Sequence, residues 1–214
     1  MLLSGGLDSS ANLALCDAHD LPVLAITARY GQKAAEQEVI AARKLCLHYG
    51  IKHEVLDLTW LGRLGGSSLT EASTEVPELI RSELDEMSII RKSAKSVWVP
   101  NRNGVLINVA ASFAERMGAS RIIVGFNREE AATFPDNSQA YLEKATEALN
   151  YSTSNHVEVY CYSTRWDKRE IVTELKKLAR PFPFEMLWSC YLGGEKPCGT
   201  CESCQRSLRA LSEI

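Results

Sequence analysis

The chain has 214 residues, of which 45% are hydrophobic and 24% are charged, the composition of an ordinary soluble globular protein. Its net charge of −3, without a basic tract, argues against nucleic acid or an anionic membrane as a partner. No apolar stretch approaches the roughly 20 residues that cross a bilayer, and no signal peptide is recognisable.

A glycine-rich loop lies at the start of the chain. Ser-Gly-Gly-Leu-Asp-Ser occupies residues 4–9, between an apolar pair and a helix-forming stretch. Its glycines let backbone N–H groups converge on an anion, and the helix start adds unpaired N–H groups. We expect a phosphate site rather than a plain capped turn, although Walker A and GxGxxG spacings are both absent. Three residues precede the loop, fewer than a normal strand needs, so we expect the natural chain to begin earlier or to lack its first residues here.

The next elements predict a βαβ unit. The pattern favours a helix at 9–19, a strand at 23–26, a helix at 33–49 that ends at Gly50, and a strand at 53–58. The stretch after the first strand is Tyr30-Gly31-Gln32-Lys33, and open α/β sheets bind ligands at the carboxyl ends of their strands. Tyr30, Gln32 and Lys33 are therefore expected to line a site, with Gly31 permitting close approach.

Residues 59–100 interrupt this pattern. Glycine, serine and threonine mark a loop up to residue 70, and only 78–92 suggests a short helix. Long irregular insertions in compact domains are usually functional or mobile. We expect a lid or an oligomer contact here.

A polar stretch precedes the next helix, which is predicted at 105–117. It contains Asn101, Arg102 and Asn103. Arg102 suits a carboxylate or phosphate, whereas Asn103 is equally suited to cap the helix.

A second polar stretch follows a buried strand predicted at 121–125. Gly125 permits close approach of the backbone, and Asn127 is suited to bind a nucleotide or the loop. Glu129 and Glu130 follow, and either a Mg²⁺ site beside a triphosphate or a solvated acidic loop explains them.

The rest of the chain predicts a helix at 139–149, a strand at 157–162 and a helix at 167–179, before two prolines end regular structure. No internal repeat or low-complexity tract is recognisable. We therefore divide the chain into a nucleotide-binding α/β domain at 1–180 and a metal-binding tail at 181–214.

The tail holds four of the seven cysteines. Cys198, Cys201 and Cys204 form two overlapping CxxC pairs, and Cys190 lies shortly before them. Four thiolates suit Zn²⁺ in a closed structural site, with an iron–sulfur cluster or a disulfide as alternatives. The odd count and the spacing favour a metal site in a reducing cytosol, and hence a cytoplasmic protein. The other three, expected to fill the core, are Cys16, Cys46 and Cys161.

Several motifs together resemble one family. They are LLSGGLDSS at 2–10, YGQK at 30–33, VPNRN at 99–103, GFN at 125–127, PD at 135–136, SCY at 189–191 and CGTCESCQR at 198–206. The loop resembles that of the PP-loop ATP pyrophosphatases. The order of all these motifs along the chain is similar to that in the 7-cyano-7-deazaguanine synthase family of queuosine biosynthesis. The resemblance implies an α/β fold of the Rossmann-like, adenine-nucleotide alpha hydrolase type, with a parallel sheet, helices on both faces and a helical zinc-binding tail.

The resemblance also implies an activity. A ligase of this family converts 7-carboxy-7-deazaguanine, ammonia and ATP into the 7-nitrile, through an activated carboxylate and an amide. One structural zinc per chain, Mg²⁺ with ATP, a homodimer and small-molecule substrates are implied as well. The zinc ligands would be Cys190, Cys198, Cys201 and Cys204.

Site residues are assigned on the same basis. Catalytic roles fall to Asp8, Ser9, Lys33 and Arg102. ATP contacts are expected from Leu2, Leu3, Ser4, Gly5, Gly6, Leu7, Asp8, Ser9, Ser10, Ala11 and Asn12. The substrate-binding residues would be Tyr30, Gln32, Lys33, Arg102, Asn103, Gly125, Asn127 and Asp136, the last accepting hydrogen bonds from the base.

The chain departs from the family pattern in two places. Relatives carry Gly-Arg-Asn in place of residues 101–103, and Asp followed by Tyr-Pro-Asp-Cys-Arg in the region of residues 129–138. The missing arginine leaves open a related PP-loop ligase that stops at the amide or uses another amine. A tRNA-modifying PP-loop enzyme and a zinc-stabilised nucleotide-binding module are further alternatives, and the net charge argues against the first of these two.

Overall fold

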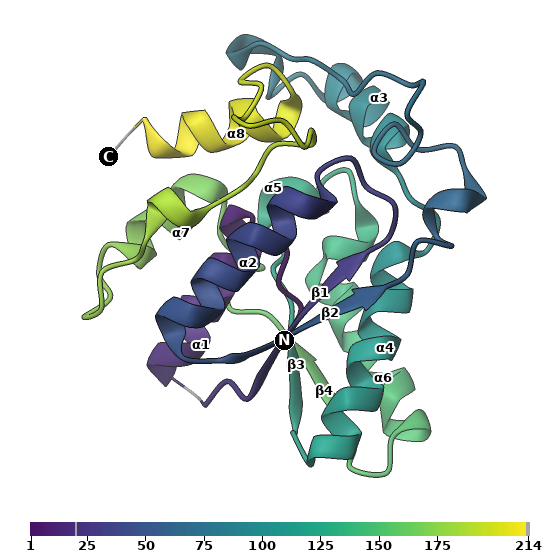
Figure 1. Cartoon of the computed structure of the whole chain (residues 1–214), viewed down its shortest axis with the longest axis vertical. Coiled ribbons are helices and arrows are strands. Elements are labelled where there is room, and N and C mark those ends of the chain that lie inside the picture. The colour runs from purple at the N-terminus through teal and green to yellow at the C-terminus, as the bar shows by residue number, and fades with distance from the viewer. Residues whose placement is uncertain (20, 213–214) are drawn as a thin grey trace.

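The structure is a computed structural model that describes residues 1–19 and 21–212; the remaining residues of the two predicted domains lie outside it. Parallel strands alternate with helices, which confirms the predicted α/β class (Figure 1). The strands are β1 (Leu24–Arg29), β2 (Lys52–Asp57), β3 (Arg121–Ile123) and β4 (Glu158–Tyr160). The α-helices are α1 (Leu7–His19), α2 (Ala35–Tyr49), α3 (Met87–Val97), α4 (Arg102–Met117), α5 (Arg128–Ala131), α6 (Gln139–Ser152), α7 (Lys168–Leu175) and α8 (Glu202–Leu211). Short 3-10 turns are η1 (Gly62–Leu64), η2 (Arg81–Glu83), η3 (Pro135–Asn137) and η4 (Phe184–Met186).

The first three residues join two pairs of parallel strands. β1 pairs with β2, and β3 pairs with β4. Leu2 forms a parallel bridge with Ile26 of β1, and its N–H donates to the carbonyl of Ile123 of β3 at 2.9 Å. The spatial order is therefore β2, β1, residues 1–3, β3, β4. Because the order reverses at residues 1–3, the glycine-rich loop leaves the sheet at its topological switch point, where such sheets bind ligands.

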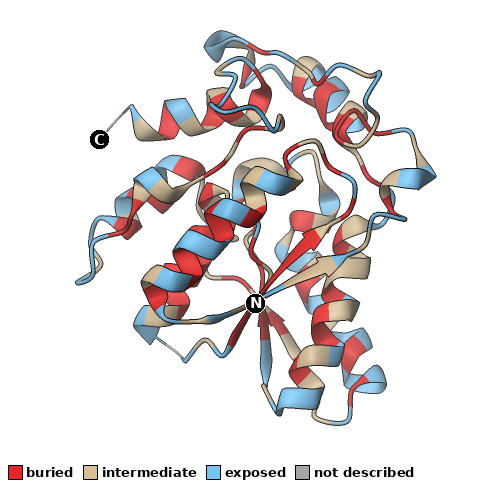
Figure 2. Cartoon of the chain, in the orientation of Figure 1, coloured by how far each residue is buried: buried red, intermediate tan, exposed pale blue. Residues whose placement is uncertain are grey.

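Helices cover both faces of the sheet, and each face has its own apolar core. Leu13, Leu45 and Ile171 mark the core under α1, α2 and α7. Ile107 and Leu142 mark the core under α4 and α6. Figure 2 shows the buried positions of these helices turned toward the sheet. Among the described residues, no helix combines the length and the apolar character needed to span a membrane.

The insertion after β2 differs from the sequence prediction. A helix expected at 78–92 begins at Met87 and runs to Val97. The physical reason is a long-range contact, because Glu78 forms an antiparallel bridge with Cys201 and Leu79 N–H donates to the Thr200 carbonyl. Residues 78–79 are thus held extended against the cysteine-rich tail.

Helix α4 also begins earlier than predicted, at Arg102. Asn101 occupies the N-cap position in a left-handed conformation with φ of 50°. Asn103 therefore lies inside the helix and does not cap it. Gly50 adopts the left-handed conformation expected of the residue that ends α2, with φ of 71°.

A half-buried histidine ties β2 to the switch point and gives a testable pH dependence. His53 Nε2 lies 2.8 Å from the Thr27 hydroxyl, which in turn donates to the Leu3 carbonyl at 2.6 Å. Burial lowers the pKa of His53, and the nearby Arg43 acts in the same direction. The unfolded chain therefore binds a proton at a higher pH than the folded protein does. The His53 contribution to stability is complete above the ordinary value of about 6.5 and declines as the pH falls below it.

We expect His53→Gln to flatten the dependence of the unfolding free energy on pH between about 5 and about 7. Urea denaturation across this range measures it, with the exposed His19→Gln as the matched control. An unchanged slope in His53→Gln would contradict this assignment.

Candidate functional site

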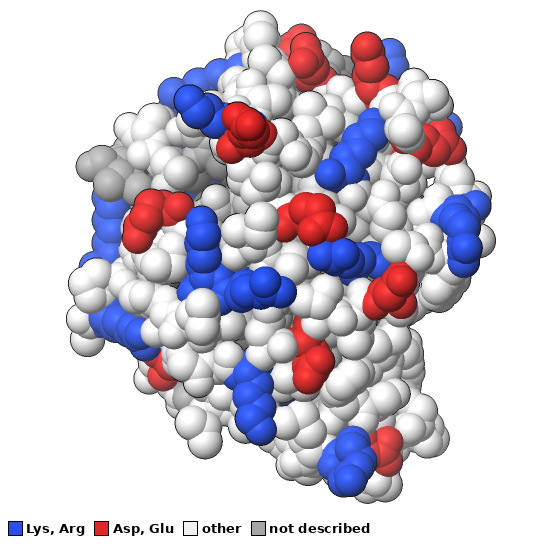
Figure 3. Space-filling view, viewed as in Figure 1, with Lys and Arg blue, Asp and Glu red and all other residues white. Residues whose placement is uncertain are grey.

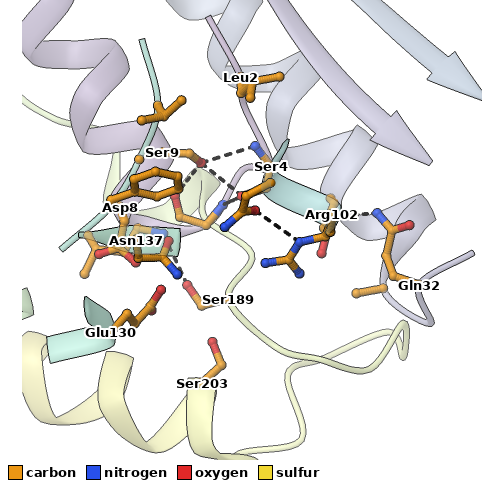
Figure 4. A pocket seen from close by; sticks show the side chains of 18 of the residues that line it. Leu2, Ser4, Asp8, Ser9, Gln32, Arg102, Glu130, Asn137, Ser189 and Ser203 are labelled. Carbon is orange, nitrogen blue, oxygen red and sulfur yellow. Dashed lines mark hydrogen bonds between the residues drawn. The ribbon is translucent and has the colours of Figure 1, made fainter. Parts of the chain in front are cut away.

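The glycine-rich loop at residues 4–6 is held by serine hydroxyls at the start of α1. Ser9 Oγ accepts a hydrogen bond from Ser4 N–H at 3.2 Å and donates to the Gly6 carbonyl at 3.2 Å. The hydroxyls of Ser4 and Ser9 lie 3.0 Å apart. Figure 4 shows the two side chains pointing toward one another. Leu7 N–H faces the Ser189 hydroxyl of the tail at 3.4 Å. The loop is thus preorganised, with N–H groups of a helix start directed into a cavity.

Two glycines explain why the loop packs so closely. Gly5 has φ of 80°, and a Cβ there would lie 2.6 Å from Cβ of Ala41 on α2. A Cβ on Gly125 would lie 2.4 Å from the backbone nitrogen of Ser9. The close approach expected at Gly125 is therefore made to the loop itself, which brings the end of β3 against the first turn of α1.

A buried lysine joins two carboxylates beside this loop. Lys168, the first residue of α7, donates to Asp8 Oδ2 and, at 2.9 Å, to Glu130 Oε1. Burial raises the pKa of Asp8 to about 6, and Lys168 offsets only part of that effect. Burial acts against the charged form of both Glu130 and Lys168. Attraction to the Lys168 ammonium nevertheless lowers the pKa of Glu130, and attraction to the two carboxylates raises the pKa of Lys168. The lysine therefore stays protonated.

This cluster has the donor set of a divalent cation site. Two carboxylates face a single ammonium, so one negative charge is left unbalanced when both are ionised. Asp8 Oδ1 is also buried without a hydrogen-bond partner. Carboxylate oxygens are the ligands that Mg²⁺ prefers, so Asp8 and Glu130 are suited to hold it.

Arg102 supplies the positive charge across the cavity from the carboxylates (Figure 4). Its Nη1 donates to the Tyr30 hydroxyl at 3.2 Å, and its guanidinium carbon lies 5.4 Å from the centroid of that ring. Its Nε donates to Asn103 Oδ1 at 3.3 Å, whereas Asn103 Nδ2 is buried without a partner. Tyr30 and Asn103 thus orient a guanidinium that can bind an anionic group.

A single cavity of about 260 Å³ collects many of the predicted site residues. Those that line it are Leu2, Leu3, Ser4, Gly6, Leu7, Asp8, Ser9, Tyr30, Gln32, Arg102, Asn103 and Gly125. Those that do not are Gly5, Ser10, Ala11, Asn12, Lys33, Asn127 and Asp136.

Three of the side chains outside the cavity have other partners. The Lys33 ammonium donates a hydrogen bond to the Thr74 carbonyl in the insertion. Asn12 donates to the Asp8 carbonyl at 2.8 Å and accepts from Tyr162 N–H at 2.8 Å, so its amide braces the first turn of α1. Asn127 Oδ1 caps α5.

Asp136, expected to contact the base, lies in η3 rather than among the cavity-lining residues. Burial raises the pKa of its carboxyl group, and Arg102 partly counteracts that effect. Asp136 therefore lies beside Arg102 and Asn103, which do line the cavity, and its contact with the base stays a prediction.

The cavity also contains residues that the sequence analysis did not assign. They include Glu38, Lys168, Ser189, Ser203 and Arg206. One signal was available, because a cation at the first position of a helix opposes the helix dipole and therefore needs a compensating partner. Lys168 occupies such a position, and Asp8 and Glu130 compensate it.

The four C-terminal cysteines converge as predicted. Their sulfur atoms all lie within 4.8 Å of one another, with 3.5 Å between Cys190 and Cys198 and 3.9 Å between Cys198 and Cys204. Tetrahedral Zn–S bonds of about 2.3 Å place sulfurs about 3.8 Å apart, so the group fits a zinc ion. Backbone N–H groups of Leu192 and Cys201 face Cys190 and Cys198 sulfurs at 3.3 Å, which favours thiolates.

The cysteine group connects the tail to the insertion and to α2. Cys190, Cys201 and Cys204 share an apolar cluster with Ala34 near the start of α2 and Val97 at the end of α3. A hydrogen-bonded charge network extends this contact along α8. Arg206 pairs with Glu129 at 3.0 Å and with Glu202 at 2.8 Å, and Arg209 pairs with Asp85 at 2.9 Å. Folding of the tail therefore positions one wall of the cavity.

The fold and the site define a parallel α/β protein with a glycine-rich loop at its switch point and a group of four cysteines that could hold a metal ion. The family model for "Queuosine biosynthesis protein QueC" matches residues 1–214. The chain belongs to this family.

Curated relatives agree with this assignment. A 7-cyano-7-deazaguanine synthase of Bdellovibrio bacteriovorus is 48% identical over 99% of this chain and 91% of its own length. One of Methanosarcina mazei is 49% identical over 100% of this chain and 93% of its own length, and one of Desulforamulus reducens is 44% identical over 100% and 93%. These relatives are enzymes, and the ligase class follows from their name.

Proposed function

We propose that this protein converts 7-carboxy-7-deazaguanine and ammonia into 7-cyano-7-deazaguanine at the expense of ATP. The observation that carries the proposal is the full-length match to synthases of that name, in a chain whose cavity combines an anion-binding loop with an oriented arginine. A carboxylate is a poor electrophile, so its activation is the chemistry that such a cavity must supply.

The proposed reaction has two activations and needs no side-chain nucleophile. Transfer of AMP from ATP to the carboxylate gives a mixed anhydride and pyrophosphate. Ammonia displaces AMP to give the amide. A second ATP then transfers AMP to the amide oxygen and releases pyrophosphate. Loss of AMP, which carries that oxygen, together with the two protons of the amide nitrogen leaves the nitrile. Catalysis is then positioning together with charge stabilisation at phosphorus.

Each part of the cavity has a role in this scheme. The hydroxyls of Ser4 and Ser9 and the N–H groups of the helix start bind phosphate oxygens. Asp8 and Glu130 would hold Mg²⁺, which when bound neutralises phosphate charge. Lys168 keeps both carboxylates in place, and Arg102 binds the substrate carboxylate and orients it toward the α-phosphate.

The cysteine group has a structural role in the proposal. Four thiolates leave no coordination position for water, so a zinc ion held by Cys190, Cys198, Cys201 and Cys204 would crosslink the tail without taking part in the reaction. The crosslink supports the wall formed by α8.

The proposed setting is the cytoplasm, with the protein acting as a homodimer on small molecules. Lysines and arginines are interspersed with acidic residues on the face shown in Figure 3, which does not resemble a nucleic-acid surface. The net charge of −3 points the same way.

Mass spectrometry of the product tests the proposed activity. The wild-type protein with ATP, Mg²⁺, the carboxylic acid and ¹⁵N-ammonium should yield a nitrile with the mass of one incorporated nitrogen. Accumulation of the carboxamide alone would favour the amide-forming alternative, which the departures at residues 134–138 motivate. Absence of any acid-dependent product would overturn the assignment.

A further inference from the structure

Glu38 occupies the cavity without a role in the scheme above. It lies in the first turn of α2 and lines the cavity beside the glycine-rich loop. A Cβ on Gly5 would lie 3.1 Å from the Glu38 carbonyl oxygen, so the backbones of the helix and the loop are in contact. Burial raises the pKa of Glu38, and a hydrogen bond from Gln32 offsets part of that effect.

Gln32 fixes the orientation of this carboxylate. Its Nε2 donates to Glu38 Oε2 at 2.8 Å and to the Ala28 carbonyl at 3.0 Å. Its Oε1 accepts from Tyr30 N–H at 2.8 Å. The amide is therefore fully used inside the protein, and Gln32, expected from the sequence to bind substrate, is a positioning residue for Glu38.

Glu38 differs from every other acidic residue that lines the cavity. Asp8 and Glu130 share the ammonium of Lys168, and Glu202 pairs with Arg206 at 2.8 Å. Glu38 has no cationic hydrogen-bond partner, and within the described part of the chain its Oε1 accepts no hydrogen bond. The cavity thus holds one oriented carboxylate oxygen that is free to accept from a ligand.

The chemistry of the ligand follows from the two poles of the cavity. A deazaguanine acid carries its carboxylate on the five-membered ring, whereas N1–H and the 2-amino group form a donor edge on the six-membered ring. Arg102 suits the first and an ionised carboxylate suits the second, because a carboxylate accepts two parallel N–H bonds. Glu38 and Arg102 both line this cavity, so one bound molecule can contact the two side chains.

We propose that Glu38, oriented by Gln32, recognises the N1–H and 2-amino donor edge of the deazaguanine base. The inference rests on the proposed function and assigns to Glu38 the base-recognition role that the family motif suggested for Asp136. Selection of a guanine-type base over one without the 2-amino group follows, because the wrong base leaves a carboxylate oxygen that Gln32 holds in place without a donor.

Equilibrium binding tests the assignment without requiring turnover. Titration calorimetry compares 7-cyano-7-deazaguanine with its analogue that lacks the 2-amino group, using wild type, Glu38→Ala and Glu38→Gln. We expect wild type to prefer the guanine-type base, and both variants to weaken its binding about 10- to 100-fold and lose most of the preference. The matched control is Glu36→Gln, an exposed residue of the same helix that pairs with Arg29 on the surface.

Four measurements separate the possible failures. ATP binding and circular dichroism of the Glu38 variants should match wild type, which shows that the loop is intact. If the Glu38 variants keep the base preference and the wild-type dissociation constants, the role of Glu38 is wrong but the proposed function still stands. A raised KM for ammonium in these variants, with unchanged base binding, would lead to the same conclusion. If wild type binds neither base, the proposed function fails together with this inference.

Discussion

Replacing Lys168 with methionine should destabilise the protein by about 3–5 kcal/mol and abolish turnover, because two partly buried carboxylates lose the buried ammonium that they share. Asp8 and Glu130 are negatively charged when ionised, and both carboxylates pair with this ammonium. Their mutual repulsion would displace the first turn of α1 and with it the phosphate-binding loop. Chemical denaturation gives the free energy of unfolding, and the product assay gives the rate.

The matched control is Lys176→Met, which removes an exposed lysine at the end of the same helix and should change neither quantity. A triple variant with Asp8→Asn, Glu130→Gln and Lys168→Met removes all three charges. It should recover much of the stability but none of the turnover, since the cation site is gone. Wild-type stability in Lys168→Met would contradict the role given to this cluster.

Removing metal from the tail should produce the second large effect. Cys201→Ser, or a strong chelator acting on wild type, should cost at least about 3 kcal/mol and lower Tm by about 6–12 °C, because the crosslink among four thiolates holds α8 to the insertion. Metal analysis should find one zinc per wild-type chain and little in the variant. Substrate binding should weaken as well, since α8 forms one wall of the cavity.

Cys46→Ala is the control for this experiment. Cys46 is buried in α2 but lies outside the four-cysteine group, so its replacement should leave the zinc content unchanged. Iron with inorganic sulfide in the wild-type protein would support the iron–sulfur alternative instead. A metal-free wild-type protein that resists the chelator would contradict a structural metal altogether.

Local patterns were sufficient for the order of helices and strands and for the glycine-rich loop. Hydrophobic periodicity and C-cap residues such as Gly50 act within a few neighbours, and the loop is a contiguous motif. The helix of the insertion was misplaced because the contact between Glu78 and Cys201 joins residues that are distant in sequence. No window of local sequence contains that information.

Only those parts of the candidate site that lie within short contiguous motifs could be predicted from the sequence. Arg102 and Ser9 line the cavity, whereas Lys33 belongs to an equally suggestive motif and has its partner in the insertion. Lys168 arrives from a helix 160 residues away from Asp8, and only the fold places it there. Motif membership locates the neighbourhood of a site, but the direction of each side chain decides its role.

The rate of ATP-dependent product formation by Asp8→Asn, compared with wild type, tests the central claim most directly. Asparagine has the same shape as aspartate but cannot supply the ionised carboxylate at the loop, so the rate should fall at least about 100-fold while the protein stays folded. Asp17→Asn, at the far end of α1, should retain the wild-type rate. A folded Asp8→Asn protein that turns over as fast as wild type would show that the nucleotide is activated somewhere other than at this loop.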